Sequence, residues 1–196
     1  MKGRVNEVLV RAGQMLRSSG CRRTGWGQFP VQVEHLFSGS ALARVDAKGR
    51  VQLPAFVRSV MARRGGDSAV LLAPHESDRC LSGHDRSWSR ELHGEAERRR
   101  LRDEAAGAER ERHHRRARRM FGLVEEADPD AAGRIVIPRM ARSAARIDGL
   151  ALFVGTGGTF EIWNPQLAIE SGDEALASLA RYRLEERDAN SVRGEE

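Results

Sequence analysis

Short apolar runs recur along the chain in two sets that have the same order. Each set has a strand-like run, a polar turn, a second short run, a helical segment and a further apolar run. The first set occupies 41–45, 50–53 and 69–73, and the second occupies 123–127, 134–137 and 151–155. Runs of this length bounded by Gly, Pro and Asp are typical of strands. The pattern therefore predicts one β-turn-β-helix unit present twice.

The two sets are copies of one sequence. Segment 45–54 recurs as segment 129–138, an offset of 84 residues (45 to 129), with Asp, Ala, Gly, Arg and Pro identical at matching positions. Apolar residues of similar type occupy the positions between these identities, and Arg58 and Arg142 also occupy matching positions further along the two copies. Self-similarity at a fixed offset indicates a repeat architecture. We therefore expect two structurally equivalent units sharing a core.

Each copy carries the same turn chemistry. Gly49 and Gly133 can adopt the positive φ that a tight turn often requires, and Asp46 and Asp130 can accept hydrogen bonds from backbone N–H groups of the turn. A proline follows each return strand, where it suits the first turn of a helix. The expected helices are Ala55–Arg63 and Arg139–Arg146.

A strongly charged stretch, 86–119, separates the copies. It is rich in Arg and Glu, contains the pair His113-His114 and has no proline, so we expect one or two solvated helices on the outside of the core. A basic helix can touch phosphates, but a charge run more often forms a solvated face.

The remaining segments have simpler patterns. Residues 156–159 predict a hairpin turn leading into a strand at Phe160–Trp163. Asn164-Pro165 predicts the start of a closing helix that reaches about Arg183, followed by a polar, frayed tail at 185–196. Residues 1–34 match neither copy, and we expect them to be disordered or loosely structured.

Composition narrows the class of protein. The net charge is +5 and the sequence pI is about 10.1, which suits an anionic partner without requiring one. The only lysines are Lys2 and Lys48, so nearly all basic charge is arginine. No membrane-length apolar run or signal peptide is visible, which predicts a cytoplasmic protein. Cys21 and Cys80 lack CxxC partners, so neither a disulfide framework nor a metal or other cofactor is expected.

The repeated Asp-x-x-Gly-Arg turn between short strands resembles the AbrB-like swapped-hairpin units. Two tandem copies, with the opening Leu36–Gly39 and the late strand Phe160–Trp163, resemble the MraZ family over residues 36–183. The resemblance implies an α+β fold in which both repeats form a swapped-hairpin β-barrel with outer helices. It further implies a transcriptional repressor of its own promoter and of the division and cell-wall gene cluster, a ring-shaped homo-oligomer, and G-rich direct repeats in promoter DNA as the target. Such a protein would be cytoplasmic and nucleoid-associated.

The resemblance also assigns boundaries and site residues. The expected divisions are 1–35 (an extension, or a misassigned start, since family members begin near Leu36), 36–84 (first repeat), 85–121 (charged helical connector), 122–165 (second repeat) and 166–196 (C-terminal helix and tail). The DNA-binding residues carried over are Asp46, Lys48, Gly49, Arg50, Asp130, Gly133 and Arg134. The second turn has Ala132 where the first has Lys48, so the two turns need not contribute equally.

The chemistry of these residues fits DNA reading. A two-stranded ribbon can enter the major groove, and an arginine there can pair with guanine O6 and N7, which is worth roughly 1–3 kcal/mol against a wrong base. Lys48 is better suited to a phosphate. The competing interpretation is that Arg50 and Arg134 form ion pairs with Asp46 and Asp130 and close the turns.

An enzyme and a protein-interaction module are the two alternatives to a DNA-binding protein. The glycine-rich segment 155–158 lacks the Gly-Lys-Ser/Thr of a phosphate-binding loop and precedes a strand, and His113-His114 lacks metal-ligand spacing, so an enzyme is not expected. A protein-interaction or assembly module on the same fold, without DNA binding, remains the alternative because fold alone does not decide function.

Overall fold

The computed structural model describes residues 35–65, 69–107 and 110–193, so the prediction for residues 1–34 lies outside the described part of the chain. In chain order the elements are β1 (Ser40–Arg44), β2 (Arg50–Gln52), α2 (Ala55–Arg63), β3 (Val70–Pro74), β4 (Leu81–Asp85), the 3-10 turn η2 (Arg86–Trp88), α3 (Ser89–Ala105), α4 (Arg110–Ala117), the π-turn η3 (Arg118–Gly122), β5 (Glu125–Ala127), β6 (Arg134–Val136), α5 (Arg139–Ala144), β7 (Leu150–Gly155), β8 (Phe160–Trp163), α6 (Pro165–Ile169) and α7 (Glu174–Arg193).

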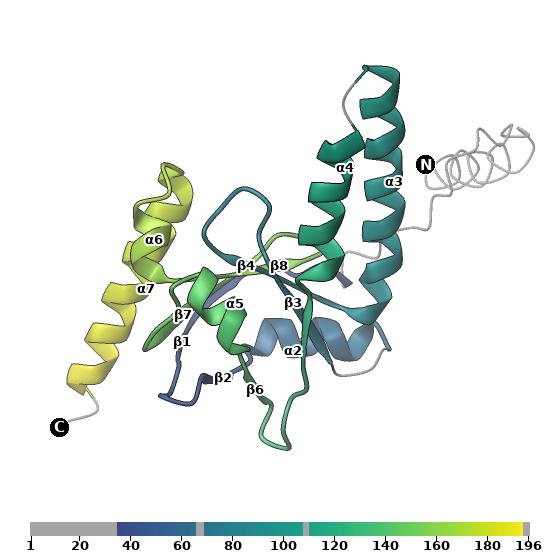
Figure 1. Ribbon diagram of the computed structural model, residues 1–196. Helices are drawn as coiled ribbons and strands as arrows, with labels where there is room; N and C mark the ends of the chain where they lie inside the picture. Colours follow the sequence, from purple (N-terminus) through teal and green to yellow (C-terminus); the bar gives the residue numbers. More distant parts are fainter. Residues whose placement is uncertain (1–34, 66–68, 108–109, 194–196) are drawn as a thin grey trace, which may run out of the picture. The chain divides into compact units, whose positions relative to one another are not determined.

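The strands form two antiparallel layers, as Figure 1 shows. Among the described residues, six strands make one sheet in the order β1-β7-β8-β4-β3-β5, and β2 pairs with β6 in a separate two-stranded ribbon. Helices α2 to α7 lie outside the strands, so the predicted mixed α+β class is confirmed. The expected closed barrel is not formed. The edge strands β1 and β5 each run through a turn into the ribbon and do not pair with each other.

The two repeats exchange strands. β1 of the first repeat pairs with β7 of the second, β5 of the second pairs with β3 of the first, and the ribbon takes one strand from each. The β-turn-β pattern predicted from the sequence is also compatible with a local hairpin, in which the two strands flanking each turn pair with each other. At the first turn they meet only in the bridge between Val45 and Val51, after which they separate. Each copy therefore completes its sheet with the other copy.

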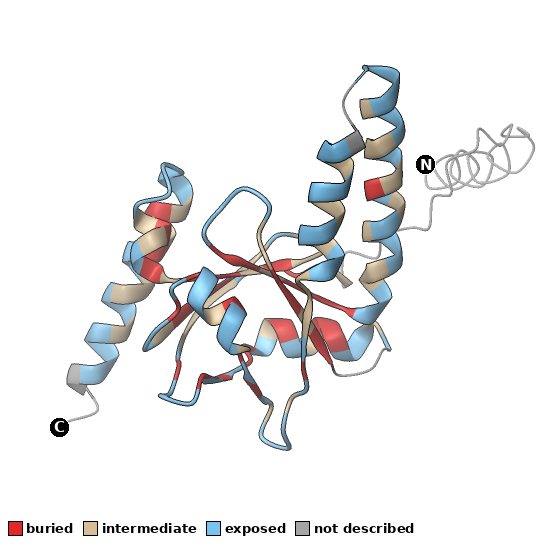
Figure 2. Ribbon diagram, in the orientation of Figure 1, coloured by how far each residue is buried: buried red, intermediate tan, exposed pale blue. Residues whose placement is uncertain are grey.

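Burial explains why the copies stay together. Val51 and Ile135 face each other across the ribbon, point inward and are almost completely buried, as are Leu53 and Ile137 just beyond them. A fully buried aliphatic side chain contributes about 1.5–3 kcal/mol. Figure 2 shows buried positions concentrated in the strands and on the inner faces of helices. The short apolar runs of both repeats thus form one core.

The repeat helices differ at their C-terminal ends. Helix α2 has the predicted bounds, whereas α5 ends at Ala144, two residues before its predicted end. Arg146 has φ 49°, the only left-handed non-glycine residue in the described part of the chain, and the N–H of Ile147 donates to the carbonyl of Arg142 (3.0 Å). These bonds cap the helix in the way that a left-handed residue, usually glycine, caps many helices.

Two elements were not predicted from the sequence. Strand β4 pairs with β3 and β8, and its Gly83 lies so close to the Phe160 ring that a Cβ would approach that ring to 2.4 Å. The predicted closing helix is divided into α6 and α7 at Gly172 (φ 86°), and the Asp173 carboxylate accepts hydrogen bonds from the first turn of α7. Helix α7 continues to Arg193, so the helix extends well into the segment that was expected to be frayed.

The charged connector forms the two antiparallel helices α3 and α4, as predicted (Figure 1). Ion pairs hold them to each other and within themselves, including Arg116–Asp103 (2.9 Å) and Arg100–Glu104 (2.7 Å). Throughout the described ranges, no helix combines the length and the hydrophobicity required to cross a membrane.

Candidate nucleic-acid interface

The first turn is closed by one aspartate. The Asp46 side chain accepts hydrogen bonds from the backbone N–H groups of Lys48 and Arg50, both at 2.9 Å to Oδ1. The N–H of Gly49 donates to the Asp46 carbonyl (2.8 Å), and Gly49 has φ 81°. An aspartate that accepts from its own turn and a glycine in the left-handed region together define the loop.

The second turn repeats this geometry closely. The Asp130 Oδ1 accepts from the N–H groups of Ala132 and Arg134, both at 2.9 Å, and Gly133 has φ 75°. The repeated sequence therefore produces a repeated structure, down to the individual hydrogen bonds.

The two turn arginines form ion pairs with the turn aspartates. Arg50 Nε lies 2.6 Å from Asp46 Oδ2, and Arg134 Nε lies 2.8 Å from Asp130 Oδ2. Backbone and side-chain hydrogen bonds from Arg50 hold the pKa of Asp46 below its ordinary value, and those from Arg134 do the same for the pKa of Asp130. The ion pairs of the competing interpretation, in which each arginine closes its own turn, are thus present. They leave 44% of the Arg50 side chain and 46% of the Arg134 side chain exposed.

Both arginines lie on one solvent-facing side of the β2–β6 ribbon. Arg50 is opposite Val136, and Arg134 is opposite Gln52, while the residue between them on each strand points into the core. Diagonal neighbours on one face of an antiparallel pair are about 7–8 Å apart. The strand exchange therefore brings together two arginines that are 84 positions apart in the sequence (50 to 134).

Each turn is supported by the other repeat. The Gln52 amide donates to the carbonyls of Ala132 (3.0 Å) and Gly133 (3.2 Å) in the second turn. A Cβ on Gly49 would lie 2.7 Å from Nη1 of Arg142, and one on Gly133 would lie 3.1 Å from Cδ of Arg58. The sequence showed that Arg58 and Arg142 are in phase, but their contacts with the opposite turn, and the role of Gln52, follow only from the strand exchange.

The turn tips differ between the repeats. Lys48 is exposed at the first tip, and Ala132 occupies the matching place at the second. On the ribbon face, Gln52 is matched by Val136, which is 51% exposed. The first repeat therefore contributes the more polar side chains to this surface.

A buried ion pair joins the end of α2 to the end of β4, and its arginine also donates a hydrogen bond to the second repeat. Arg64, which caps α2, lies with Nη1 2.5 Å from Asp85 Oδ2, and donates to the carbonyls of His35 (2.6 Å) and Gly158 (3.1 Å). Burial by itself raises the pKa of Asp85, but hydrogen bonds from Ser87 and Arg64 outweigh burial and hold that pKa below its ordinary value. No sequence motif identified this pair, and its separation of 21 residues gives no local signal.

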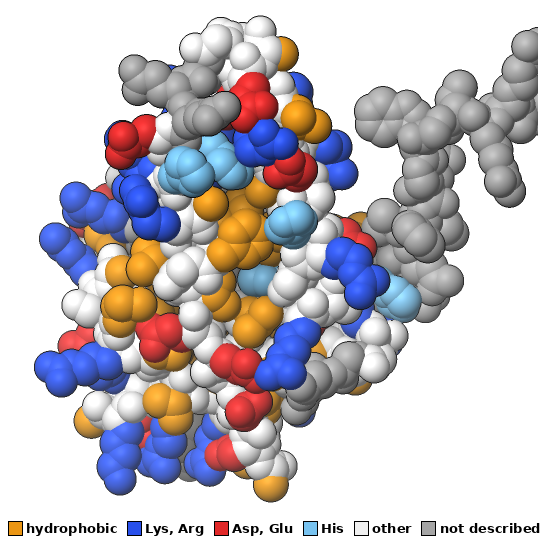
Figure 3. Space-filling model, turned by 45° about the vertical axis from the view of Figure 1, so that its right-hand side comes forward, with side chains coloured by type: hydrophobic (Ala, Val, Ile, Leu, Met, Phe, Trp, Pro, Cys, Tyr) orange, Lys and Arg blue, Asp and Glu red, His pale blue; other side chains and the backbone are white. Residues whose placement is uncertain are grey.

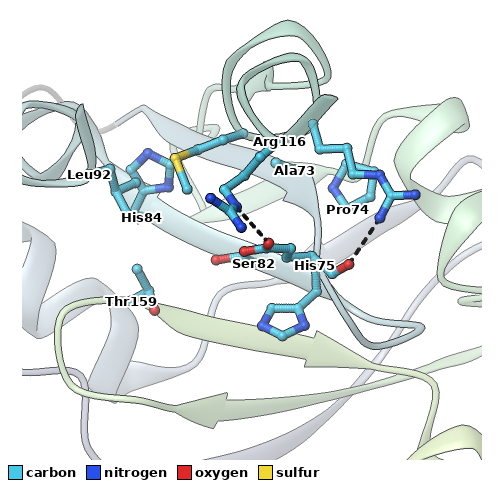
Figure 4. Close-up of a pocket in the computed structure, with 11 residues that line it drawn as sticks. Ala73, Pro74, His75, Ser82, His84, Leu92, Arg116 and Thr159 are labelled. Atoms are coloured by element: carbon cyan, nitrogen blue, oxygen red, sulfur yellow. Dashed lines mark hydrogen bonds and ion pairs between the residues drawn. The ribbon is translucent and has the colours of Figure 1, made fainter. Parts of the chain in front are cut away.

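A pocket of about 170 Å³ lies between the sheet and the connector, lined by side chains that include His84, Leu92, Met120, Arg116 and Arg119. Figure 4 shows His84 beside Leu92 in this pocket. Arg116 Nε lies 3.1 Å from Glu76 Oε1. Figure 3 shows hydrophobic side chains gathered in the middle of one face with charged groups around them. Burial lowers the pKa of His84, so this histidine stays neutral near pH 7.

Comparison with known proteins places these features in a family. A family model described as "MraZ protein, putative antitoxin-like" matches residues 120–167. A protein of Gluconobacter oxydans is 30% identical over 158 residues, which is 80% of this chain and 92% of the relative. A protein of Saccharophagus degradans is 28% identical over 156 residues (76% and 100%), and one of Marinobacter nauticus is 31% identical over 147 residues (71% and 92%).

All three relatives carry the name transcriptional regulator MraZ. The identity extends over most of both chains. The chain belongs to the MraZ family.

Proposed function

We propose that this chain is a DNA-binding transcription regulator that reads bases with the exposed face of the β2–β6 ribbon. The observation that carries the proposal is the placement of Arg50 and Arg134 together on that face, each fixed by an aspartate of its own turn. The names of the relatives support regulation of transcription in general. The other assigned residues, Asp46, Lys48, Gly49, Asp130 and Gly133, shape the turns or reach toward phosphates.

The ion pairs are compatible with base reading and can assist it. The Arg50 contact with Asp46 uses Nε, which leaves the Nη1/Nη2 end of the guanidinium to approach a guanine edge. Arg134 contacts Asp130 through both Nε and Nη2, which leaves its Nη1 group for such a contact. An arginine already held in one orientation loses less freedom on binding DNA, which favours affinity. The same carboxylate thus closes the turn and aims the arginine.

The dimensions of the ribbon suit the major groove. B-DNA's major groove is about 12 Å wide and admits a two-stranded β-ribbon. A single ribbon of three residues per strand contacts only a few base pairs. Tight binding to DNA therefore requires several ribbons in one assembly, because linked sites bind at a high effective concentration. We accordingly propose a ring-shaped homo-oligomer that reads G-rich direct repeats.

The finer assignments follow from the resemblance to the family. We propose that the chain represses its own promoter and the division and cell-wall gene cluster, and that it acts in the cytoplasm on nucleoid DNA. The exchange of β1, β2 and β5 between repeats supports the swapped-hairpin, AbrB-like arrangement. The functional divisions 36–84, 85–121, 122–165 and 166–196 are part of this proposal.

The test is a gel-shift with duplex DNA from directly upstream of the gene, compared with a scrambled duplex at two salt concentrations. The wild-type chain should prefer the upstream duplex. Arg50→Ala and Arg134→Ala should each abolish that preference while the oligomer is retained. Lys48→Ala should weaken both duplexes about equally and lower the salt slope by roughly one. Melting temperatures measured on the same variants separate base reading from turn closure. An Arg50→Ala protein that keeps its preference contradicts the base-reading role.

A protein-interaction module on the same fold is the second candidate. The exposed apolar side chains of Val136 on the ribbon and Met140 on α5 favour it, being 51% and 49% exposed. Light scattering should give a mass several times the 21.8 kDa of the chain under either proposal. An oligomer that binds neither duplex would support the interaction module.

A further inference from the structure

An open groove lies between the first turn and helix α5. Its lining includes Ala47 from the turn and Arg139, Arg142 and Arg146 from α5 and its C-terminal cap, and its volume is about 450 Å³. Arg139 and Arg142 are three residues apart on one face of α5, and Arg146 follows in the left-handed cap just beyond the end of the helix. The groove is therefore a short basic track that starts beside the first turn.

The charges of this track are largely uncompensated. Within the described residues, none of the three guanidinium groups forms an ion pair, in contrast to the turn arginines. The one carboxylate in the lining is that of Asp148, and the exposed Lys48 lies at the tip of the adjoining turn. The lining thus holds three cationic side chains and one acidic side chain, and Lys48 lies nearby at the tip of the turn.

At the other end of the ribbon, the described residues in the matching places form no equivalent track. With the offset of 84 residues Arg139 and Arg142 match Ala55 and Arg58, and the counterpart of Arg146 just after its helix is Gly65. Arg58 donates to the Leu53 carbonyl (3.1 Å), and Ala132 replaces Lys48 at the turn tip. The turns are repeated in both copies, whereas among the described residues in these matching places the three arginines are gathered beside the first turn.

The conformation of Arg146 gives independent support. Its φ of 49° lies in the left-handed region, which glycine adopts most easily, and the first repeat has Gly65 (φ 66°) at the end of its own helix. A residue that keeps a strained backbone conformation where glycine would serve suggests a role for its side chain. Here the side chain is exposed and lines the basic groove.

We propose that this groove holds the sugar-phosphate backbone of duplex DNA next to the bases that the ribbon contacts. The inference rests on the proposed DNA-binding function and extends it to residues outside the turns. Three arginines along one open groove can contact more than one phosphate, since each strand of B-DNA advances about 3.4 Å per phosphate along the helix axis. Arg142 connects the two surfaces because it lies against Gly49, the residue before Arg50. The two ends of the ribbon therefore have different tasks, with sequence-independent affinity supplied mainly at the first turn.

The experiment measures binding of full-length variants to the upstream and scrambled duplexes over a range of salt concentrations. Arg139→Gln and Arg146→Gly should each weaken both duplexes by a similar factor, leave the ratio between them unchanged and lower the salt slope by about 0.9. Arg146→Gly should also hold or raise the melting temperature, because glycine relieves the backbone strain. Asp148→Asn should strengthen binding to both duplexes. The matched control is Arg181→Gln on α7, an exposed position that loses the same charge and should alter neither the slope nor the affinity.

The possible results separate the two proposals. If the wild-type chain binds neither duplex, the proposed function fails and the groove has no DNA to hold. If the wild-type chain binds with preference but the groove variants behave like Arg181→Gln, the groove proposal alone is overturned. A groove variant that changes the ratio between duplexes also overturns it, since a phosphate contact carries no sequence information.

Discussion

Replacing Arg64 tests how strongly the buried Arg64–Asp85 pair stabilises the fold. The Arg64 and Asp85 side chains are only 6% and 1% exposed, and Arg64 also stacks over Phe37 at 4.5 Å and Trp88 at 5.2 Å. In Arg64→Met, a side chain of similar length keeps part of this packing, whereas the Asp85 carboxylate loses its cation. The carbonyl of Gly158 loses its charged donor at the same time.

The expected loss follows from the burial of the pair. Removing one partner of a buried ion pair costs about 3–5 kcal/mol, because the other charge is left uncompensated. Domains unfold with free energies of about 5–15 kcal/mol, so the variant should lose a large share of its stability. For a chain of this length each kcal/mol shifts the melting temperature by about 2–4 °C, which gives a fall of roughly 10 °C.

The assay is urea unfolding of wild type, Arg64→Met, Asp85→Asn and the double variant. Residues in direct contact should be coupled, so the double variant should lose clearly less than the sum of the two single losses. If Arg64→Met unfolds within about 1 kcal/mol of wild type, the pair does not hold the structure together. Strictly additive losses would likewise show that Arg64 and Asp85 act independently.

Three further outcomes follow from the local chemistry. The turn hydrogen bonds lower the pKa of Asp46 and Asp130 in the folded state. The two ionised carboxylates therefore contribute fully to stability above the ordinary pKa of 3.8, and this contribution is lost as the pH falls through the lowered values. The unfolding free energy of the double variant Asp46→Asn/Asp130→Asn should accordingly depend less on pH below 3.8 than that of wild type. Gly49→Ala should lose about 1–3 kcal/mol by chemical unfolding, and more than Gly65→Ala, since both have positive φ but only Gly49 would press its new Cβ against a neighbour. Burial raises the pKa of the Cys80 thiol, so in a Cys21→Ser background a thiol reagent near pH 8 should label Cys80 only on unfolding, and rapid labelling of the native protein would contradict its burial.

Local elements were predicted well because their signals are local. The apolar run and the proline before Ala55 gave α2 its observed bounds, and the Asp-x-x-Gly-Arg sequence specified both turns. Strand β4 was missed because the segment Leu81–Asp85 has few β-branched or aromatic residues, and its Gly83 is explained by the Phe160 ring packed over it. The break between α6 and α7 did have a signal, namely a glycine followed by an aspartate cap at Asp173.

Pairing between distant segments has no signal in the apolar pattern and was implied only by the resemblance to the family. The same apolar pattern in β1 and β5 is compatible with a local hairpin and with exchange between repeats, because both bury the same side chains. The choice decides where the site residues lie. A local hairpin would place Arg50 and Arg134 on separate ribbons, whereas exchange places both on one face. The identity of the turn residues was thus accessible from the sequence, while the common surface, Gln52 and the track along α5 required the three-dimensional structure.

Strand exchange also bears on when this protein can fold during synthesis. The first strand, β1, finds its partner β7 more than 100 residues later, so the edge of the nascent sheet stays unpaired until the second repeat has left the ribosome. Translation of the first repeat alone should give a chain without a complete core. By the same reasoning, a chain cut in the connector between α3 and α4 should give two fragments, each lacking the strands that the other supplies. Each fragment would therefore fold only together with the other. The intact chain can be regarded as a dimer of repeats whose two halves are made in equal amounts, because both are translated from one mRNA.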